Sequence, residues 1–277
     1  MQRLGVVSFL NARPLIAGLD ANNGVALLYD VPARLPAWLD GDRVDAALVP
    51  IIDVLRAGER YRVVSDACIG CDGETMTVRV FSQVPPDRIR TLRADVDSHT
   101  SVALARVLWR EIYDRPLQVE PFDPRHDRSG DAEAVLLIGD KVVDPARGRF
   151  AYEVDLGGAW RQHTGLPFVF AVWAIKADAF DLRGTGALST LLAEARDRGV
   201  AEAAAIAERY GPQLGWPVEL ARRYLTRCLS YRLDARAVAG ADQFAALCAR
   251  AGLVPRDTHI AWPSGLRAPA AVDTIRQ

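Results

Sequence analysis

Small polar side chains follow apolar, strand-like runs at several places in this 277-residue sequence. In the stretch SFLNARPL, Ser8 and Asn11 come just after a short apolar run. Pro14 then suits the first turn of a helix, because it needs no amide partner there. The side chain of Asn11 either caps this helix or contacts a ligand, and asparagine is suited to both roles. These residue types indicate a hydrogen-bonding group at the end of a strand.

A second polar group lies in the stretch DVDSHTSVAL, residues 95–104. Ser98, Thr100 and Ser101 stand at the start of a well-formed helix. The free amides of a helix start, with hydroxyls beside them, bind carboxylates and phosphates. Ordinary capping explains the same residues, and both interpretations stay open here. Asp97 would repel an anion, so we assign it a capping or turn-stabilising role.

A third stretch, DLGGAWRQHTGLPFVFAVW, combines two glycines with aromatic residues and with His163. The glycines permit unusual backbone angles, and the aromatic side chains are more often core than pocket. His163 is an available acid or base. The sequence contains no Ser-His-Asp order, HExxH, P-loop or GxGxxG motif, so covalent, zinc and nucleotide-dependent chemistries have no positive support.

The charge balance excludes several classes of partner. The chain carries 34 basic and 35 acidic residues, which gives no electrostatic footprint for nucleic acid or an anionic membrane. No apolar run approaches the roughly 18 residues that span a bilayer. The first residues lack the pattern of a signal peptide, so we expect a soluble cytoplasmic protein. The oligomeric state stays open.

The four cysteines are interpreted as structural. Cys68 and Cys71 form a lone CxxC, and Cys228 and Cys248 lie far away in the sequence. A zinc site would need a second pair or histidines at ligand spacing. A redox motif would open a helix after a strand, whereas the neighbouring glycines predict a turn. We therefore expect reduced cysteines and no metal.

The order of elements predicts an α/β fold with a discontinuous first lobe. The first 80 residues alternate strand-like and helix-like segments, which is typical of a mainly parallel sheet. A second α/β unit follows, and residues 183–253 have helical character. We predict lobe 1 from residues 1–80 and 173–277, lobe 2 from residues 81–172, and a substrate cleft between them. The predicted strands are 4–9, 25–31, 44–50 and 61–67, and a further helix begins near 101, with Val102, Ala105, Leu108 and Trp109 on its buried face.

Several of these stretches together resemble the chorismate dehydratase (MqnA) family of the futalosine route to menaquinone. The resemblance rests chiefly on SFLNARPL and TGLPFVFAVW, and it extends over VDAALVP, VRVFS, DSHTSVAL, LLIGDKVV and YLTRCLSYRL. It implies a two-lobed fold similar to type II periplasmic binding proteins. It also implies a lyase that removes water from chorismate to give 3-[(1-carboxyvinyl)oxy]benzoate, with no metal or organic cofactor.

The resemblance also carries over individual residues. Asn11 is the expected catalytic residue, because the family motif places it at the reacting part of chorismate. His99 stands where the family has an arginine, and GETM at 73–76 stands where the family has GPV. The expected substrate-binding residues are Ser8, Thr77 (a serine in the family), Ser98, Thr100 and Ser101.

Two other functions are compatible with these residues. One is a non-catalytic binding protein for a small carboxylate, because the same fold serves that purpose. The other is a sister enzyme of the same pathway that cleaves a futalosine-derived nucleoside. Incubation with chorismate separates all three.

Overall fold

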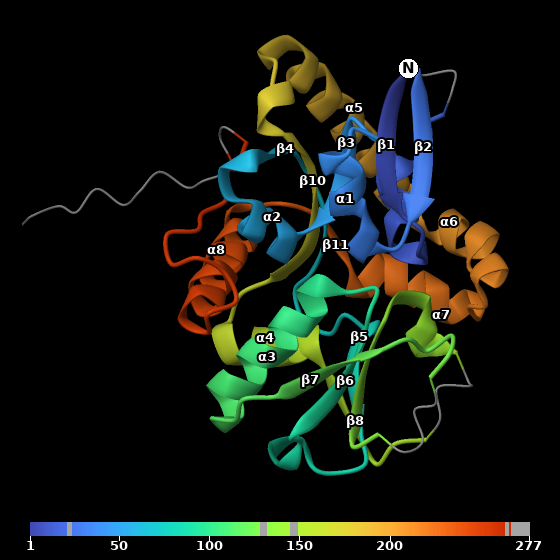
Figure 1. Ribbon diagram of the computed structural model, residues 1–277. Coiled ribbons are helices and arrows are strands. Elements are labelled where there is room, and N and C mark those ends of the chain that lie inside the picture. The colour runs from blue at the N-terminus through green and yellow to red at the C-terminus, as the bar shows by residue number, and fades with distance from the viewer. Residues whose placement is uncertain (21–23, 128–131, 145–148, 264–265, 267–277) are drawn as a thin grey trace, which may run out of the picture.

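The computed structural model describes residues 1–20, 24–127, 132–144, 149–263 and 266, and these residues form two lobes. Figure 1 shows lobe 1 in the upper half and lobe 2, in green, below it. Each lobe is built around one mixed sheet with helices on its faces. The predicted two-lobed α/β class is confirmed.

Lobe 1 contains a six-stranded sheet in the order β11-β4-β10-β3-β1-β2. β1 runs parallel to β2 and β3, whereas β10 runs antiparallel to both β3 and β4. The strands of the first 80 residues, β1 to β4, all run in the same direction, as the sequence predicts, because β3 and β4 are both antiparallel to β10. The sheet as a whole is mixed, because the chain returns from lobe 2 along β10 and inserts it between β3 and β4. The strands are β1 (Gln2–Val7), β2 (Val25–Asp30), β3 (Ala46–Pro50), β4 (Tyr61–Cys71), β10 (Phe168–Lys176) and β11 (Ser230–Arg232).

The helices between the first strands are short. The predicted helix start at Pro14 is wrong: a 3₁₀ helix already begins at Leu10 and contains Pro14. Burial of Leu10, Leu15 and Ile16 anchors this turn in the core, and this compensates for the amide that proline lacks. The elements are η1 (Leu10–Ile16), η3 (Pro32–Arg34), α1 (Leu35–Asp40), α2 (Ile51–Ala57) and η4 (Gly58–Arg60).

Lobe 2 contains a five-stranded sheet in the order β7-β6-β8-β5-β9. Its long helix buries Ala105, Leu108 and Trp109 and half-buries Val102, as the 3.6-residue period predicts. The elements are β5 (Val78–Ser82), η5 (Pro86–Arg88), β6 (Thr91–Asp95), α3 (His99–Tyr113), β7 (Gln118–Phe122), β8 (Ala134–Ile138), η6 (Gly139–Val143), β9 (Tyr152–Asp155) and α4 (Leu156–Thr164).

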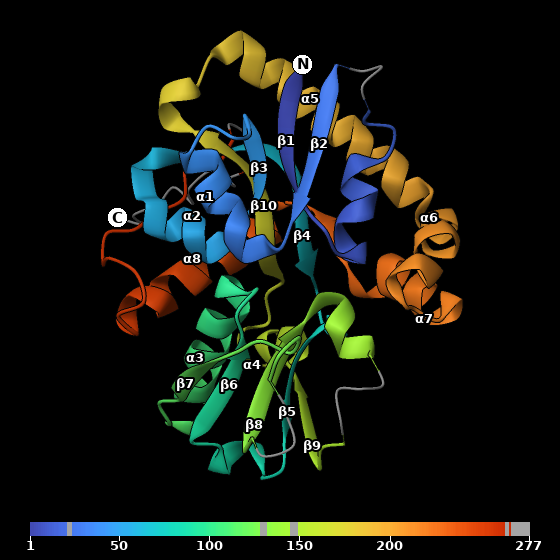
Figure 2. The ribbon, with the colours of Figure 1, turned by 45° about the vertical axis from the view of Figure 1, so that its right-hand side comes forward.

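The C-terminal helices contact elements of lobe 1. α5 contacts β4 and η1, α6 contacts η1, and α8 contacts β10 (Figure 2). The helical character predicted for residues 183–253 is interrupted after Cys228, because the next residues pair with β4 as the edge strand β11. The elements are η8 (Ala177–Ala179), α5 (Leu182–Ala201), α6 (Ala203–Tyr210), η9 (Pro212–Leu214), α7 (Val218–Arg223), the π-helical turn η10 (Tyr224–Cys228) and α8 (Ala235–Arg250).

The chain crosses between the lobes twice. Lobe 1 strand β4 ends at Cys71 and lobe 2 strand β5 begins at Val78; on the return, α4 ends at Thr164 and β10 begins at Phe168. The predicted domain boundaries at residues 80 and 172 stay a prediction. The chain passes from the lobe 1 sheet to the lobe 2 sheet through residues 72–77, and it returns from α4 of lobe 2 to the lobe 1 sheet through residues 165–167.

The carboxylate of Asp155 fixes the first crossing. It accepts hydrogen bonds from the Thr75 amide (2.9 Å) and the Met76 amide (2.7 Å), and it also caps α4 through the Gly158 amide (2.9 Å). Burial raises the pKa of this carboxyl group, although these three hydrogen bonds act in the opposite direction.

The CxxC segment is not the turn that the sequence predicts. Cys68 and Cys71 lie in the last part of β4, which pairs with β10 on one side and β11 on the other. All four cysteines are buried with free thiols. Burial raises the pKa of the Cys71 thiol to about 12, which makes this thiol a poor nucleophile and metal ligand.

Aromatic side chains pack where β10 enters lobe 1. The rings of Trp160, Phe168 and Phe244 meet edge to face, with centroids 5.0 to 6.0 Å apart. Trp160 and Phe168 are therefore core residues, whereas the neighbouring Phe170 lines the cavity described next.

Candidate functional site

A cavity lies between the lobes, at the carboxyl ends of β1 and β3 and at the start of α3. Residues of lobe 1, of the first crossing segment, of lobe 2 and of η10 all contribute to its wall. Among the described residues that line it, none carries a charged side chain. Its polar lining consists of Asn11, Thr75, Thr77, Ser98, Ser101 and Tyr224.

Asn11 is not a helix cap. The N-cap of η1 is Phe9, and no side chain caps that helix. The Oδ1 atom of Asn11 is buried and has no hydrogen-bond partner among the described residues. A buried polar atom left unpaired costs about 1–3 kcal/mol, and a bound ligand or water removes this cost. The Oδ1 atom is therefore available to a ligand in the cavity.

The hydroxyl of Tyr224 meets both Asn11 and Thr77. Its Oη atom lies 2.6 Å from Oγ1 of Thr77, and its ring stacks on Trp216 with centroids 4.8 Å apart and planes 12° apart. Burial raises the pKa of Tyr224, and hydrogen bonds from Thr77 and Asn11 only partly offset this. The phenol therefore stays protonated and can donate a hydrogen bond. Tyr224 opens a π-helical turn, a geometry that is frequent at functional sites.

The start of α3 points into the same cavity. Ser98 is the N-cap, and its Oγ accepts a hydrogen bond from the Ser101 amide at 3.2 Å. Ser98 and Ser101 both line the cavity, so capping and ligand binding are compatible here. The positive end of the α3 dipole and neutral hydroxyls together favour an anionic group at this wall.

Two of the predicted binding residues lie outside the cavity lining. Thr100 is buried between the lobes, where its Oγ1 donates to the carbonyl oxygen of Phe170 (3.2 Å) and accepts from the Ile52 amide (3.4 Å). Ser8 is half-buried, and its amide donates to the Asp30 carbonyl. For these two residues substrate contact stays a prediction.

The ionisable residues at the start of α3 do not line the cavity. His99 places Nδ1 2.8 Å from Oδ2 of Asp53 in lobe 1, and its side chain is 40% exposed. The sequence suggested a capping or turn-stabilising role for Asp97. The cap of α3 is Ser98 instead, and the carboxylate of Asp97 binds Lys141 at 2.8 Å. The predicted alternative acid or base, His163, lies on α4 and is exposed.

The sequence interpretation missed Tyr224, Trp216 and Asp140. Asp140 follows β8 in lobe 2, and its carboxylate accepts hydrogen bonds from the Leu10 amide (3.3 Å) and from Nε1 of Trp216 (2.8 Å) in lobe 1. Burial raises the pKa of Asp140 to about 6, against the effect of these hydrogen bonds and of Arg13 and Lys141 nearby. The motif LLIGDKVV was visible in the sequence, but its contact with SFLN appears only in the folded protein.

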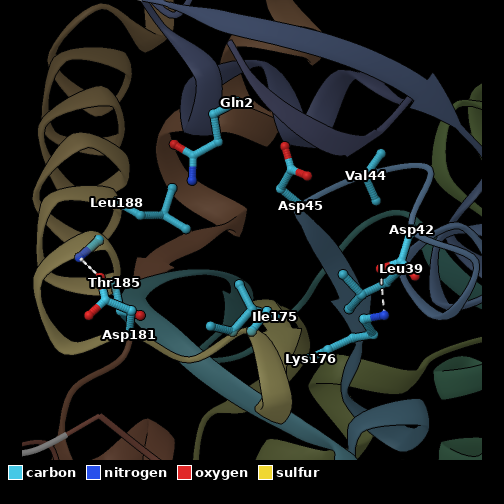
Figure 3. A pocket seen from close by; sticks show the side chains of 12 residues that line it. Gln2, Leu39, Asp42, Val44, Asp45, Ile175, Lys176, Asp181, Thr185 and Leu188 are labelled. Carbon is cyan, nitrogen blue, oxygen red and sulfur yellow. Dashed lines mark hydrogen bonds and ion pairs between the residues drawn. The ribbon is translucent and has the colours of Figure 1, made fainter.

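A second depression lies at the far end of the lobe 1 sheet, between α5 and the strands (Figure 3). It is acidic, with Asp42, Asp45 and Asp181 in its wall, and these carboxylates are already engaged. Asp42 pairs with Lys176 at 2.5 Å, and Asp181 caps α5. None of the residues predicted for the site lies here, so we assign the function to the cavity between the lobes.

Comparison with known families decides the relationship of the chain. A family model described as menaquinone biosynthesis matches residues 2–250. The chain belongs to this menaquinone biosynthesis family. Within the described residues, no helix is long and apolar enough to span a membrane, and no cluster of three or more His, Cys, Asp or Glu side chains is placed to hold a metal ion.

One curated relative carries a name that matches the sequence interpretation. A chorismate dehydratase from Thermus thermophilus is 28% identical over 238 residues, which cover 80% of this chain and 86% of the relative. The name of this relative states an activity on chorismate.

Solved structures confirm the two-lobed fold that the sequence predicts for this chain. Protein AF1704 from Archaeoglobus fulgidus has a TM-score of 0.70 at 14% identity and covers 91% of this chain and 98% of its own. The CA3427 gene product of Candida albicans, described as having the generic periplasmic binding protein fold, has a TM-score of 0.64 at 13% identity and covers 92% and 91%. The periplasmic aliphatic sulphonate binding protein SsuA from Escherichia coli has a TM-score of 0.60 at 14% identity and covers 93% and 94%.

Proposed function

We propose that this protein binds chorismate between its lobes and removes water from it, giving 3-[(1-carboxyvinyl)oxy]benzoate in the futalosine route to menaquinone. The observation that carries the proposal is the buried, unpartnered Oδ1 of Asn11 in a hydroxyl-lined cavity of a menaquinone biosynthesis family member. The similar Thermus thermophilus protein supports chorismate as the substrate. A cytoplasmic location belongs to the same proposal.

The uncharged wall is consistent with this substrate. Chorismate carries two carboxylates, and the α3 start with Ser98 and Ser101 offers an anion one set of donors. Thr77 and Tyr224 add two further hydroxyl groups to the lining of the cavity. In a buried, neutral setting such donors act strongly, because little water competes with them.

The reaction makes modest demands on the protein. The C3–H and C4–O bonds of the ring break, the hydroxyl group leaves with a proton as water, and the ring becomes aromatic. Aromatisation supplies the driving force, so positioning and electrostatic stabilisation carry much of the catalysis. The described lining offers no carboxylate or imidazole as a base, and we propose that the enolpyruvyl carboxylate of the substrate takes the C3 proton while Asn11 holds the geometry.

Incubation of the purified protein with chorismate tests the proposal. We expect formation of the aromatic enol ether, followed by absorbance and mass spectrometry. Binding without conversion would instead favour the carboxylate-binding protein, and the absence of any effect on chorismate would contradict both and favour the sister enzyme.

Replacement of Asn11 by alanine tests the role of its amide. We expect Asn11→Ala to lower kcat by about 100-fold or more, the usual effect of losing a preorganised polar group at a reacting centre. Asn11→Ala removes an unpaired Oδ1 but also the hydrogen bond to Tyr224, and these effects oppose each other, so the melting temperature should change by only a few degrees. Gln2→Ala removes an amide side chain from the far depression and should leave turnover unchanged. A large loss of stability in Asn11→Ala would contradict this role.

A further inference from the structure

Three consecutive residues of lobe 2 contact the turn of lobe 1 that carries Asn11. Gly139 has a φ of +60°, and a Cβ atom added to it would lie 2.6 Å from Cδ2 of Phe9. The residue therefore has to be glycine if the Phe9 ring is to lie this close. The ammonium group of Lys141 lies 5.5 Å from the centroid of the same ring.

Asp140 makes the polar contact of this group. Both of its carboxylate oxygens lie 3.3 Å from the amide nitrogen of Leu10, the residue before Asn11. Oδ1 also accepts a hydrogen bond from Nε1 of Trp216 at 2.8 Å. The carboxylate thus joins η6 of lobe 2 to two separate segments of lobe 1.

Each hydrogen-bond partner of Asp140 is next to a residue that lines the cavity. Leu10 is bonded to Asn11 in the same 3₁₀ helix. Trp216 stacks on Tyr224, whose hydroxyl group hydrogen-bonds to Thr77. Asp140 itself does not line the cavity, so its carboxylate acts through these neighbours.

We propose that Asp140 is a positioning residue: by holding the Leu10 amide and the Trp216 indole, it closes lobe 2 onto lobe 1 and sets Asn11 and Tyr224 at the reacting part of the substrate. Lys141 supports this arrangement from the other side. Its ammonium group binds Asp95 at the end of β6 (2.6 Å) and Asp97 in the turn that leads to Ser98 (2.8 Å). The same short helix therefore fixes the Asn11 side and the α3 side of the site.

The proposal rests on the proposed function only for its kinetic test. Asp140→Asn keeps the shape of the side chain but replaces the charged acceptor by a weaker one. We expect kcat for chorismate to fall by about 10- to 100-fold and KM to change by less than about threefold, because the hydroxyl groups of the lining remain in place. Asp42→Asn removes a carboxylate from the far depression and should change neither value.

A double mutant separates positioning from direct catalysis. If Asp140 acts through Asn11 as well as through Trp216 and Tyr224, Asp140→Asn should lower kcat clearly less in the Asn11→Ala background than in the otherwise wild-type protein, because only the route through Trp216 remains. An equal loss in both backgrounds would show that Asp140 acts independently of Asn11 and would overturn the proposal. Trp216→Phe keeps an aromatic ring beside Tyr224 but removes the indole donor, and should lower kcat by about 3- to 10-fold.

Hydrogen exchange tests the contact without any substrate. In Asp140→Asn, peptides that cover residues 9–16 should exchange at least about tenfold faster, while peptides from β1 keep their rate. Faster exchange throughout the molecule would indicate a merely structural role, and unchanged exchange at 9–16 would equally overturn the proposal. If the wild-type protein does not convert chorismate, the proposed function fails while this measurement still decides the role of Asp140. Should Asp140→Asn not fold, Asp140→Glu, which keeps the charge but displaces the carboxylate from the Leu10 amide, offers the same readout.

Discussion

The helices α3 and α4 of lobe 2 begin in opposite ways. α3 is capped by the neutral hydroxyl group of Ser98 and faces the cavity between the lobes. α4 is capped by the carboxylate of Asp155, which also binds the amides of the first crossing segment. An acidic cap already places a negative charge at the helix start, whereas a serine cap leaves the helix dipole for an incoming anion.

The same contrast extends to the rest of the described chain. α5 and α8 are also capped by carboxylates, those of Asp181 and Asp234. Four helices in the described residues are capped by a side chain. The one with a neutral cap, α3, is the helix that faces the cavity. The choice of cap separates helix starts that hold the fold together from the one that we propose to meet substrate.

Conversion of the α3 cap into the acidic type should have the largest effect. Ser98→Asp keeps a good N-cap, so stability should change by less than about 1 kcal/mol. The added carboxylate should oppose a chorismate carboxylate and raise KM or Kd by about 100-fold, which corresponds to about 2.7 kcal/mol. Steady-state kinetics and calorimetric titration measure the effect. Ser98→Thr, which keeps a hydroxyl cap, serves as the control, and unchanged affinity in Ser98→Asp would show that the anion binds elsewhere.

The reverse exchange on α4 should lower stability instead of affinity. Asp155→Ser retains a cap for α4, but the shorter side chain no longer reaches the amides of Thr75 and Met76. Leaving two buried donors without partners should lower the free energy of unfolding by about 2 kcal/mol, measured by urea denaturation. If stability is unchanged, the carboxylate does not hold the crossing segment.

The pH dependence of this loss has a defined sign. The pKa of Asp155 is raised in the folded protein, so the folded state binds its proton more tightly than the unfolded state. The contribution of Asp155 to stability is therefore greatest below the unfolded pKa of about 4 and decreases as the pH rises through the folded pKa. The difference between wild type and Asp155→Ser in urea denaturation should be larger at pH 4 than at pH 7. An opposite trend would mean that the ionised carboxylate is the form that the fold prefers.

An acidic cap whose carboxylate binds no crossing segment should matter least. Asp234 caps α8 through the Ala237 amide at 2.7 Å. Asp234→Ser exchanges one good cap for another and weakens a favourable interaction with the helix dipole, so the loss should be about 0.5 kcal/mol in thermal unfolding, with no change in turnover. A loss as large as that of Asp155→Ser would mean that helix capping alone, and not the crossing segment, explains the effect on α4.

Local sequence patterns predicted much of the fold. The strands of lobe 1 and the buried face of α3 follow from apolar runs and from helical periodicity, because burial on one face leaves a local signature. The polar residues Asn11, Ser98 and Ser101 stand at strand ends and helix starts, and the structure brings them together in one cavity. Positions of this kind are visible from neighbouring residues alone.

Features that depend on distant contacts could not be predicted in this way. Tyr224 reaches Thr77 across 147 residues, and Asp140 reaches Leu10 across 130. The segment around Tyr224 has the composition of an ordinary α-helix, and its π turn and the strand β11 depend on packing against β4. The 3₁₀ form of η1 is likewise set by the core beneath it and not by the preference of Pro14.

The lysine content gives the protein a natural chemical reporter. Its two lysines, Lys141 and Lys176, lie in very different places. Lys141 is held by Asp95 and Asp97 beside the Phe9 ring, at the meeting point of the lobes, whereas Lys176 pairs with Asp42 at the distal end of β10. Acylation of Lys141 by an amine-reactive reagent should therefore follow the opening of the lobes, while Lys176 provides an internal reference in the same molecule. A single mass spectrum of modified peptides can thus report the balance between open and closed protein without any label being introduced.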